Sequence, residues 1–244
     1  MIGMVLAAGA GRRLGEDTRD LPKTLLPVDG KRTILDIALA NLSSVGLEKA
    51  VVVTGFASDR IEEVREKLAK KHDIEVELCF NPKAEEWNNA YSLWVAREYF
   101  SEGVLLVNGD TVHPASVEES LLASRGSAQI VIALDDVKRL GQEEMKVHLN
   151  DEGFLDKINK SLYHATAEGE YIGLTLIEPA AAEKLAEALE AVWRRDPQLY
   201  YEDGFQEYAD RGGRIGVARI GSVEWVEVDD HADLERAREV ACRC

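Results

Sequence analysis

Apolar and polar positions follow two patterns along the chain. Short runs that are almost wholly apolar predict buried strands at Met1–Ala7, Lys49–Thr54 and Gly103–Asn108. Longer stretches with apolar residues at helical spacing predict helices at Ile34–Val45 and Ser58–Lys71. Strands that alternate with amphipathic helices indicate an α/β fold, in which helices cover both faces of a mostly parallel sheet. We therefore expect a three-layer α/β/α sandwich.

The second half of the chain has a different texture. Two short strands around the turn at Asn150–Gly153 predict a hairpin, and proline suits the first turn of a helix over Pro179–Arg194. No linker rich in proline, glycine or serine separates the halves, so we expect one domain over residues 1–244. Residues 135–244 would add a small lid to the half formed by residues 1–134. The other expected elements are Glu75–Phe80, Asn89–Tyr99, Ala128–Leu134, Met145–Leu149, Leu155–Asn159, Tyr171–Ile177, Ile215–Arg219, Glu224–Val228 and Ala232–Cys244.

The charge and composition exclude several classes of protein. The 244 residues include 45 Asp plus Glu against 29 Lys plus Arg, a formal net charge of −16. Nucleic acids and anionic membranes bind basic faces, so neither partner is expected. No apolar run is long enough to span a bilayer, and the first residues lack a signal-peptide pattern. Cys79, Cys242 and Cys244 match no zinc template or disulfide framework, which indicates a reducing cytoplasm.

A glycine-rich segment follows the first strand, Leu6-Ala7-Ala8-Gly9-Ala10-Gly11-Arg12-Arg13-Leu14-Gly15, and Leu21-Pro22-Lys23 comes soon after. Small residues let backbone N–H groups approach a phosphate closely, and arginine and lysine add positive charge. A tight turn without a ligand is one alternative. A dinucleotide site is another, but it requires an acidic residue after the second strand, which here ends in Thr54-Gly55. The Walker pattern lacks its closing Gly-Lys-Ser/Thr.

The run Leu6–Gly15 with Pro22-Lys23 resembles the signature of nucleotidyltransferases that join a nucleoside triphosphate to a sugar phosphate or a small phospho-alcohol. Within that superfamily, the segment Glu86–Trp94 (EWNNAYSLW) is similar to that of phosphocholine and inositol-phosphate cytidylyltransferases. The resemblance extends over nearly the whole chain and ends with Trp225–Asp229. It implies the fold of the nucleotide-diphospho-sugar transferases, with a mixed central sheet. Residues 1–134 would bind the nucleotide, and residues 135–244 would bind the acceptor.

Carboxylates suited to a divalent metal follow two of the predicted strands. Asp110 comes after Gly103–Asn108, and ligands of open α/β sheets bind beyond the carboxyl ends of the strands. Mg²⁺ is commonly held by one or two carboxylates, with phosphate oxygens and waters in its other positions. The resemblance assigns Asp110 and Asp229 to Mg²⁺. The alternatives are a turn residue for Asp110 and a helix cap for Asp229, although its neighbour Asp230 could serve as that cap.

The resemblance also implies roles for individual side chains. Arg13 would bind the triphosphate, and Lys23 would stabilise charge on the α-phosphate. The expected nucleotide-binding residues are Leu6, Ala8, Gly9, Ala10, Gly11, Arg12, Thr54, Asn88, Asn89 and Gly109. The expected acceptor-binding residues are Tyr91, Lys146, Glu170, Tyr200, Glu202, Asp203 and Glu227.

Several of these acceptor residues have simpler alternatives. Tyr91 could belong to the buried stripe of a helix, and Glu170 and Glu227 could be solvated carboxylates. Lys146 stands where the phosphocholine enzymes carry an aromatic residue. This departure moves the expectation from choline toward inositol phosphate, another polyol phosphate or a phosphonate.

We therefore expect a CTP-dependent cytidylyltransferase that moves CMP to a small phosphorylated alcohol, similar to phosphocholine or inositol-1-phosphate, and releases pyrophosphate. The five histidines are scattered and form no catalytic constellation, which agrees with direct in-line transfer. One alternative is a sugar-1-phosphate nucleotidyltransferase that uses UTP or dTTP. Another is a nucleotide sensor without turnover on the same fold. The sequence leaves the oligomeric state open, a homodimer included.

Overall fold

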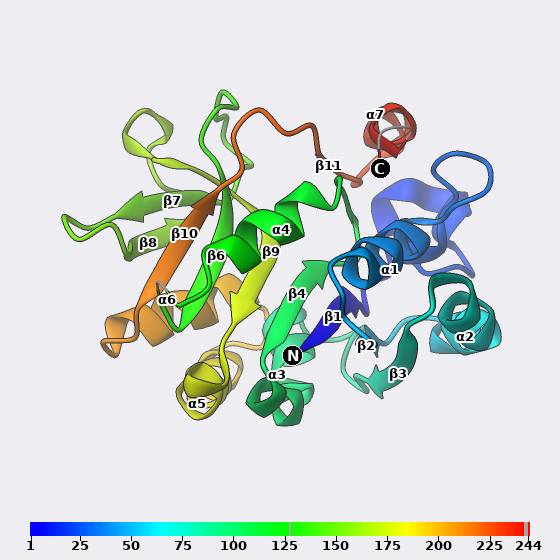
Figure 1. Ribbon diagram of the computed structural model, residues 1–244, viewed down its shortest axis with the longest axis horizontal. Helices are drawn as coiled ribbons and strands as arrows, with labels where there is room; N and C mark the ends of the chain where they lie inside the picture. Colours follow the sequence, from blue (N-terminus) through cyan, green and yellow to red (C-terminus); the bar gives the residue numbers. More distant parts are fainter. Residues whose placement is uncertain (127, 242–243) are drawn as a thin grey trace.

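The computed structural model describes residues 1–126, 128–241 and 244 (Figure 1). Its main sheet runs in the order β10-β6-β9-β4-β1-β2-β3, and the β7–β8 hairpin joins it through pairing of β7 with the first residues of β9. These strands are β1 Ile2–Ala7, β2 Lys49–Thr54, β3 Glu75–Phe80, β4 Val104–Asn108, β6 Ile130–Asp135, β7 Lys146–Leu149, β8 Leu155–Asn159, β9 Gly169–Ile177 and β10 Ile215–Arg219. A separate ribbon joins β5 (Thr111–Val112) to β11 (Val226–Glu227).

The sheet is mixed but mostly parallel, as the sequence predicts. β1, β2, β3 and β4 run parallel to one another, and β10 runs parallel to β6. β9 is antiparallel to both β4 and β6. Because β9 lies between β4 and β6, strands from the second half of the chain complete the sheet that the first half begins.

Helices cover both faces of the sheet, because each strand sends alternate side chains to opposite sides. From β1, Met4 packs into the core beneath α3, α5 and α6, and Val5 packs into the core beneath α1, α2 and α4. Helix α7 closes a third, smaller core with the segment that follows the glycine-rich loop. The helices are α1 Ile34–Ser44, α2 Ser58–His72, α3 Asn89–Val95, α4 Ser116–Ala123, α5 Ala182–Arg195, α6 Tyr201–Asp210 and α7 His231–Ala241.

Several boundaries differ from the sequence-based expectation. The helix expected over Asn89–Tyr99 ends at Val95, and a 3₁₀ turn follows it. Helices α4 and α6 were not expected. The pattern of α6 is interrupted by Gly204, where a Cβ would stand 2.5 Å from Leu189 Cδ2, so this glycine allows α6 to pack closely on α5.

Two further expectations concern the closing helix and membrane-spanning segments. The closing helix covers His231–Ala241, and Cys242 lies outside the described residues. Among the residues that the structure describes, no helix combines the length and the apolar character that crossing a bilayer would require.

Candidate active site

Lys23 lies between two carboxylates that are far apart in the sequence. Its Nζ is 2.8 Å from Asp110 Oδ2 and 3.0 Å from Asp229 Oδ1. Arg13 adds a second contact to Asp229, with 2.8 Å between its guanidinium and Oδ2. The structure thus brings together both predicted metal ligands and both predicted catalytic cations, and their roles stay predictions.

Backbone pairing explains how Asp229 reaches Asp110. In the β5–β11 ribbon Glu227 pairs with Thr111, and the Val228 N–H donates to the Asp110 carbonyl over 2.9 Å. The Asp229 side chain is not the cap of α7, because Asp230 accepts the Asp233 N–H over 3.0 Å. Asp229 is therefore free of the capping role that the sequence offered as an alternative.

The carboxylates here fit a hard divalent cation. One oxygen each from Asp110, Glu227 and Asp229 can be chosen so that all lie within 4.8 Å of one another. Asp110 Oδ1 is buried and has no hydrogen-bond partner among the described residues, so one ligand atom is left unsatisfied by the protein. A set of carboxylate oxygens suits Mg²⁺ better than a softer metal.

The same charges shift the proton affinities of two groups. Burial by itself would lower the pKa of Lys23, but the carboxylates of Asp110 and Asp229 outweigh it and raise the pKa above its ordinary value. Lys23 is therefore an ammonium at neutral pH. Glu227 is exposed as a residue, yet desolvation of its carboxyl, with the charges of Asp110 and Asp229, raises its pKa to about 8.

The glycine-rich loop folds back against Lys23. Gly11 has a φ of +58° and begins the 3₁₀ turn Arg12–Thr18, and a Cβ at Gly11 would stand 2.9 Å from Lys23 Cβ. Thr18 Oγ1 donates to the Gly11 carbonyl over 2.8 Å, which holds the loop in this shape. Glycine is required here both for the left-handed backbone and for the close approach to Lys23.

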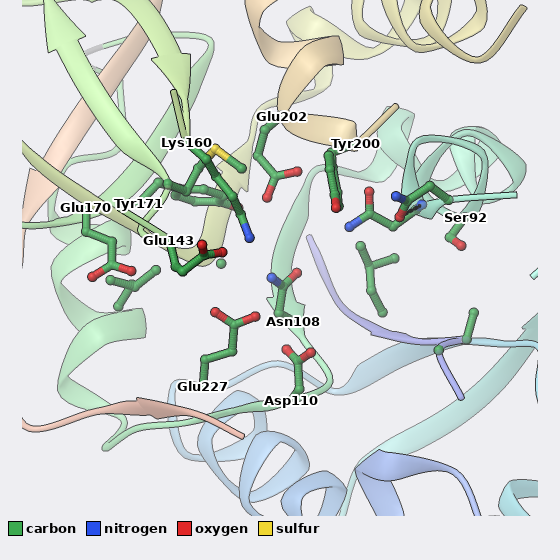
Figure 2. A pocket seen from close by; sticks show the side chains of 18 residues that line it. Ser92, Asn108, Asp110, Glu143, Lys160, Glu170, Tyr171, Tyr200, Glu202 and Glu227 are labelled. Atoms are coloured by element: carbon green, nitrogen blue, oxygen red, sulfur yellow. Dashed lines mark hydrogen bonds between the residues drawn. The ribbon is translucent and has the colours of Figure 1, made fainter. Parts of the chain in front are cut away.

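A cavity of ≈ 240 Å³ opens beside this cluster (Figure 2). Of the residues that the sequence predicts, it is lined by Leu6, Ala8, Gly9, Asn88, Asn89, Asp110, Glu170, Tyr200, Glu202 and Glu227. A second cavity of ≈ 610 Å³ shares part of this lining and continues past Arg13 and Asp229 toward α7. Asp203 lines a smaller neighbouring cavity, and its Oδ2 accepts the Tyr200 N–H at the start of α6.

The structure places Lys146 differently from the expectation. Its side chain is buried, and its Nζ donates to the backbone carbonyls of Gln142, Glu144 and Lys160 over 2.9, 3.1 and 2.6 Å. All three protons of an ammonium are then used. In this structure the lysine fixes two loops at the rim of the cavity, and its contact with the acceptor stays a prediction.

Among the other predicted residues, Ala10, Arg12, Thr54, Tyr91 and Gly109 do not line this cavity. Tyr91 packs in an aromatic cluster, with its ring centroid 4.9 Å from that of Trp87 and 5.3 Å from that of Trp193. These contacts fit the alternative of a buried helix stripe, and acceptor binding by Tyr91 stays a prediction. Thr54 is buried at the end of β2. Gly109 allows close packing, since a Cβ there would stand 2.4 Å from the Leu6 carbonyl oxygen.

Sequence reasoning missed several residues that line the cavity. Asn108 accepts a hydrogen bond from the Tyr201 hydroxyl over 2.9 Å, and that hydroxyl is 3.0 Å from the Tyr171 hydroxyl. The position of Asn108 at the end of a buried strand, two residues before Asp110, could have indicated it. The others reach the site from helix α3, from loops and from strand β9: Ser92, Glu143, Met145, Lys160 and Tyr171.

Two curated relatives match nearly the whole length of this chain. The chain is 32% identical over 243 residues to the CMP-5'-(3-aminopropyl)phosphonate synthase of Streptomyces rubellomurinus, covering 96% of this chain and 38% of the relative. It is 27% identical over 241 residues to the bifunctional IPC transferase and DIPP synthase of Aquifex aeolicus, covering 97% of this chain and 50% of that relative. The chain thus spans half or less of the length of these two relatives.

A solved structure confirms the fold class. The inositol-1-phosphate CTP transferase from T. maritima superposes with a TM-score of 0.81 at 25% sequence identity, covering 98% of this chain and 94% of that one. Residues 3–200 match the family described as the MobA-like NTP transferase domain. The chain therefore belongs to the family of MobA-like NTP transferase domains.

Proposed function

We propose that this chain transfers CMP from CTP to a small phosphorylated alcohol or phosphonate and releases pyrophosphate. The observation that carries the proposal is Lys23, held 2.8 and 3.0 Å from two carboxylates beside a cavity. The names of the Streptomyces relative and of the T. maritima structure support CTP as the nucleotide.

In this proposal the nucleotide site is formed by the part of the cavity lining that comes from residues 1–134. The triphosphate would lie along the glycine-rich loop, with Arg13 at its outer end, because the Arg13 side chain is 72% exposed beside Asp229. Asn89 is a better candidate than Asn88 for contact with the base or ribose. Both groups of the Asn88 amide already make hydrogen bonds, since its Oδ1 caps α3 and its Nδ2 donates to the Gln198 carbonyl. For Asn89 the recorded bond is made by Oδ1, which accepts the Tyr201 N–H.

The reaction needs positioning and charge neutralisation more than proton transfer. An oxygen of the acceptor's phosphate or phosphonate attacks the α-phosphorus, and the bond from the α-phosphorus to the departing pyrophosphate breaks. The attacking oxygen is already ionised, so no general base is required. Lys23 would stabilise the charge that develops on the α-phosphoryl oxygens. Asp110 and Asp229, with Glu227 beside them, would hold Mg²⁺, which supplies further positive charge to the phosphates.

Pyrophosphate release with Mg²⁺ tests the proposal directly. CTP, UTP, dTTP and ATP are each combined with phosphocholine, inositol-1-phosphate, glycerol phosphate, 2-aminoethylphosphonate and glucose-1-phosphate. We expect release with CTP and at least one of the four acceptors that are not sugar phosphates. Release confined to UTP or dTTP with glucose-1-phosphate would place the chain among sugar-1-phosphate enzymes. Tight CTP binding without turnover on any acceptor would favour a nucleotide sensor.

A further inference from the structure

The cavity has an unusual balance of charge for a protein that binds phosphates. Its described lining carries five carboxylates, from Asp110, Glu143, Glu170, Glu202 and Glu227, against one ammonium from Lys160. Figure 2 shows the side chains of Glu143, Glu202 and Glu227 around the same space as Lys160. Phosphate groups by themselves would be repelled by this lining, so part of the ligand is expected to be cationic.

Most of these carboxylates already have a use within the protein. Asp110 faces Lys23 and belongs to the candidate metal cluster with Glu227. Glu170 is 2.9 Å from the Nζ of Lys138. At Asp110 and Glu170 a new partner would have to replace an existing ion pair.

Glu202 differs from them. It lies in the first turn of α6, is only 7% exposed, and its Oε2 has no hydrogen-bond partner among the described residues. Its carboxylate is drawn pointing into the cavity, between Lys160 and Tyr200 (Figure 2). A buried carboxylate oxygen without a donor is costly, because the hydrogen bonds lost to water are not replaced. The missing donor is expected to arrive with the ligand.

The surroundings of Glu202 suit an ammonium that carries N–H groups. A quaternary ammonium is recognised by the faces of several aromatic rings. The described lining offers two rings, Tyr171 and Tyr200, and the Lys160 ammonium already lies 5.8 Å from the centroid of the Tyr200 ring. A primary ammonium instead needs hydrogen-bond acceptors, which Glu202 and Glu143 supply.

Resting on the proposed function, we infer that the acceptor is a zwitterion with a primary ammonium at one end, and that Glu202 determines its selection. The phosphate or phosphonate end lies toward Asp110, Lys23 and Lys160. Lys160 makes no ion pair within the described part of the chain, so its charge is available to that end. In this arrangement the two ends of the acceptor meet opposite charges within one cavity, and a neutral polyol leaves Glu202 without a charged partner.

The test compares acceptors that differ only at the end opposite the phosphate. With CTP, kcat/KM is measured for 2-aminoethyl phosphate, 2-hydroxyethyl phosphate and phosphocholine. We expect the amine to exceed the alcohol by about 100-fold or more, since a site built for a hydrogen-bonding group rejects analogues that lack it. In Glu202→Gln this preference should fall below about tenfold, through a higher KM for the amine, while KM for CTP stays within about twofold.

Glu207→Gln is the matched control, because Glu207 is on the same helix but faces Arg195 and Arg211. It should keep the preference for the amine, and unchanged circular dichroism would show that both variants fold. An alcohol or phosphocholine used as well as the amine, or a Glu202→Gln variant that keeps the full preference, would overturn the inference while leaving the proposed function intact. No pyrophosphate release from CTP with any acceptor would overturn both.

Discussion

Replacing Lys23 by methionine removes the charge at the centre of the site and keeps most of the side-chain length. The wild-type ammonium lies 2.8 Å from Asp110 and 3.0 Å from Asp229, and its side chain is 13% exposed. Removing one partner of a fully buried ion pair costs about 3–5 kcal/mol. Because the two carboxylates are 25% and 26% exposed, water can solvate them in part. We therefore expect the free energy of unfolding to fall by a smaller amount, about 1–3 kcal/mol.

Lys23→Met should also lower kcat, and by more than partial unfolding of the variant could explain. Removing one preorganised electrostatic group from an active site lowers kcat by about 10²–10³, which corresponds to about 2.7–4 kcal/mol. Steady-state pyrophosphate release with saturating CTP and Mg²⁺ measures kcat, and urea unfolding shows that the variant is folded at the assay temperature. The nucleotide should still bind, because Arg13 and the glycine-rich loop are unchanged.

Lys31→Met is the matched control, since Lys31 is exposed and makes no ion pair within the described part of the chain. Its kcat should stay within about twofold of the wild type, as expected for a surface substitution. A Lys23→Met variant with kcat within about threefold of the wild type would refute the role of Lys23. An equal loss in Lys31→Met would show that the assay reports general damage.

Three other substitutions test separate parts of the structure. Asp110→Asn should abolish most activity and reduce the rise in Tm that Mg²⁺ causes in the wild type, as followed in a thermal melt with and without the ion. Lys146→Met leaves three backbone carbonyls without their donor. The free energy of unfolding should therefore fall by about 1–3 kcal/mol, and KM for the acceptor should rise more than KM for CTP. Equal changes in both KM values would contradict the role of Lys146 in ordering the cavity rim. Burial, with the nearby Asp203, raises the pKa of Glu202 from 4.5 to about 7, with Lys160 acting in the opposite direction. Because the ionised form of Glu202 is disfavoured in the folded state, the free energy of unfolding of the wild type falls as pH rises from 4.5 to about 7. Glu202→Gln should gain about 1–3 kcal/mol over the wild type between pH 4.5 and pH 8 in urea unfolding, and a pH-independent difference would count against this.

Much of the fold could be predicted from the sequence because most of its strands and helices have strong local sequence patterns. The strands β2 and β3 begin and end at the predicted residues, since each is a short apolar or alternating run bounded by polar or glycine positions. Helix α6 was missed for an equally local reason. Its glycine and its two aspartates are poor helix formers, and it forms because Gly204 lets it pack against Leu189.

Residues of the candidate site could be predicted from the sequence only where a local motif indicates a particular chemistry. The glycine-rich loop and Lys23 could be singled out because small residues and cations in that order suit phosphates. Tyr91 and Lys146 could not be assigned in the same way. An aromatic residue on a helix can belong to a core or to a ligand site, and only the structure shows that Tyr91 packs against Trp87 and Trp193.

The amino-acid sequence by itself determined the alternation of strands and helices and the net charge of −16, and it predicted a phosphate-binding role for the first loop. Only the tertiary structure decided which charges meet. Asp229 reaches Asp110 through the pairing of β11 with β5, and Lys146 turns inward because three carbonyls surround its ammonium. The physical reason is that periodicity depends on neighbours within a few residues, whereas the partner of a charge depends on contacts between distant segments that only the packed chain brings together.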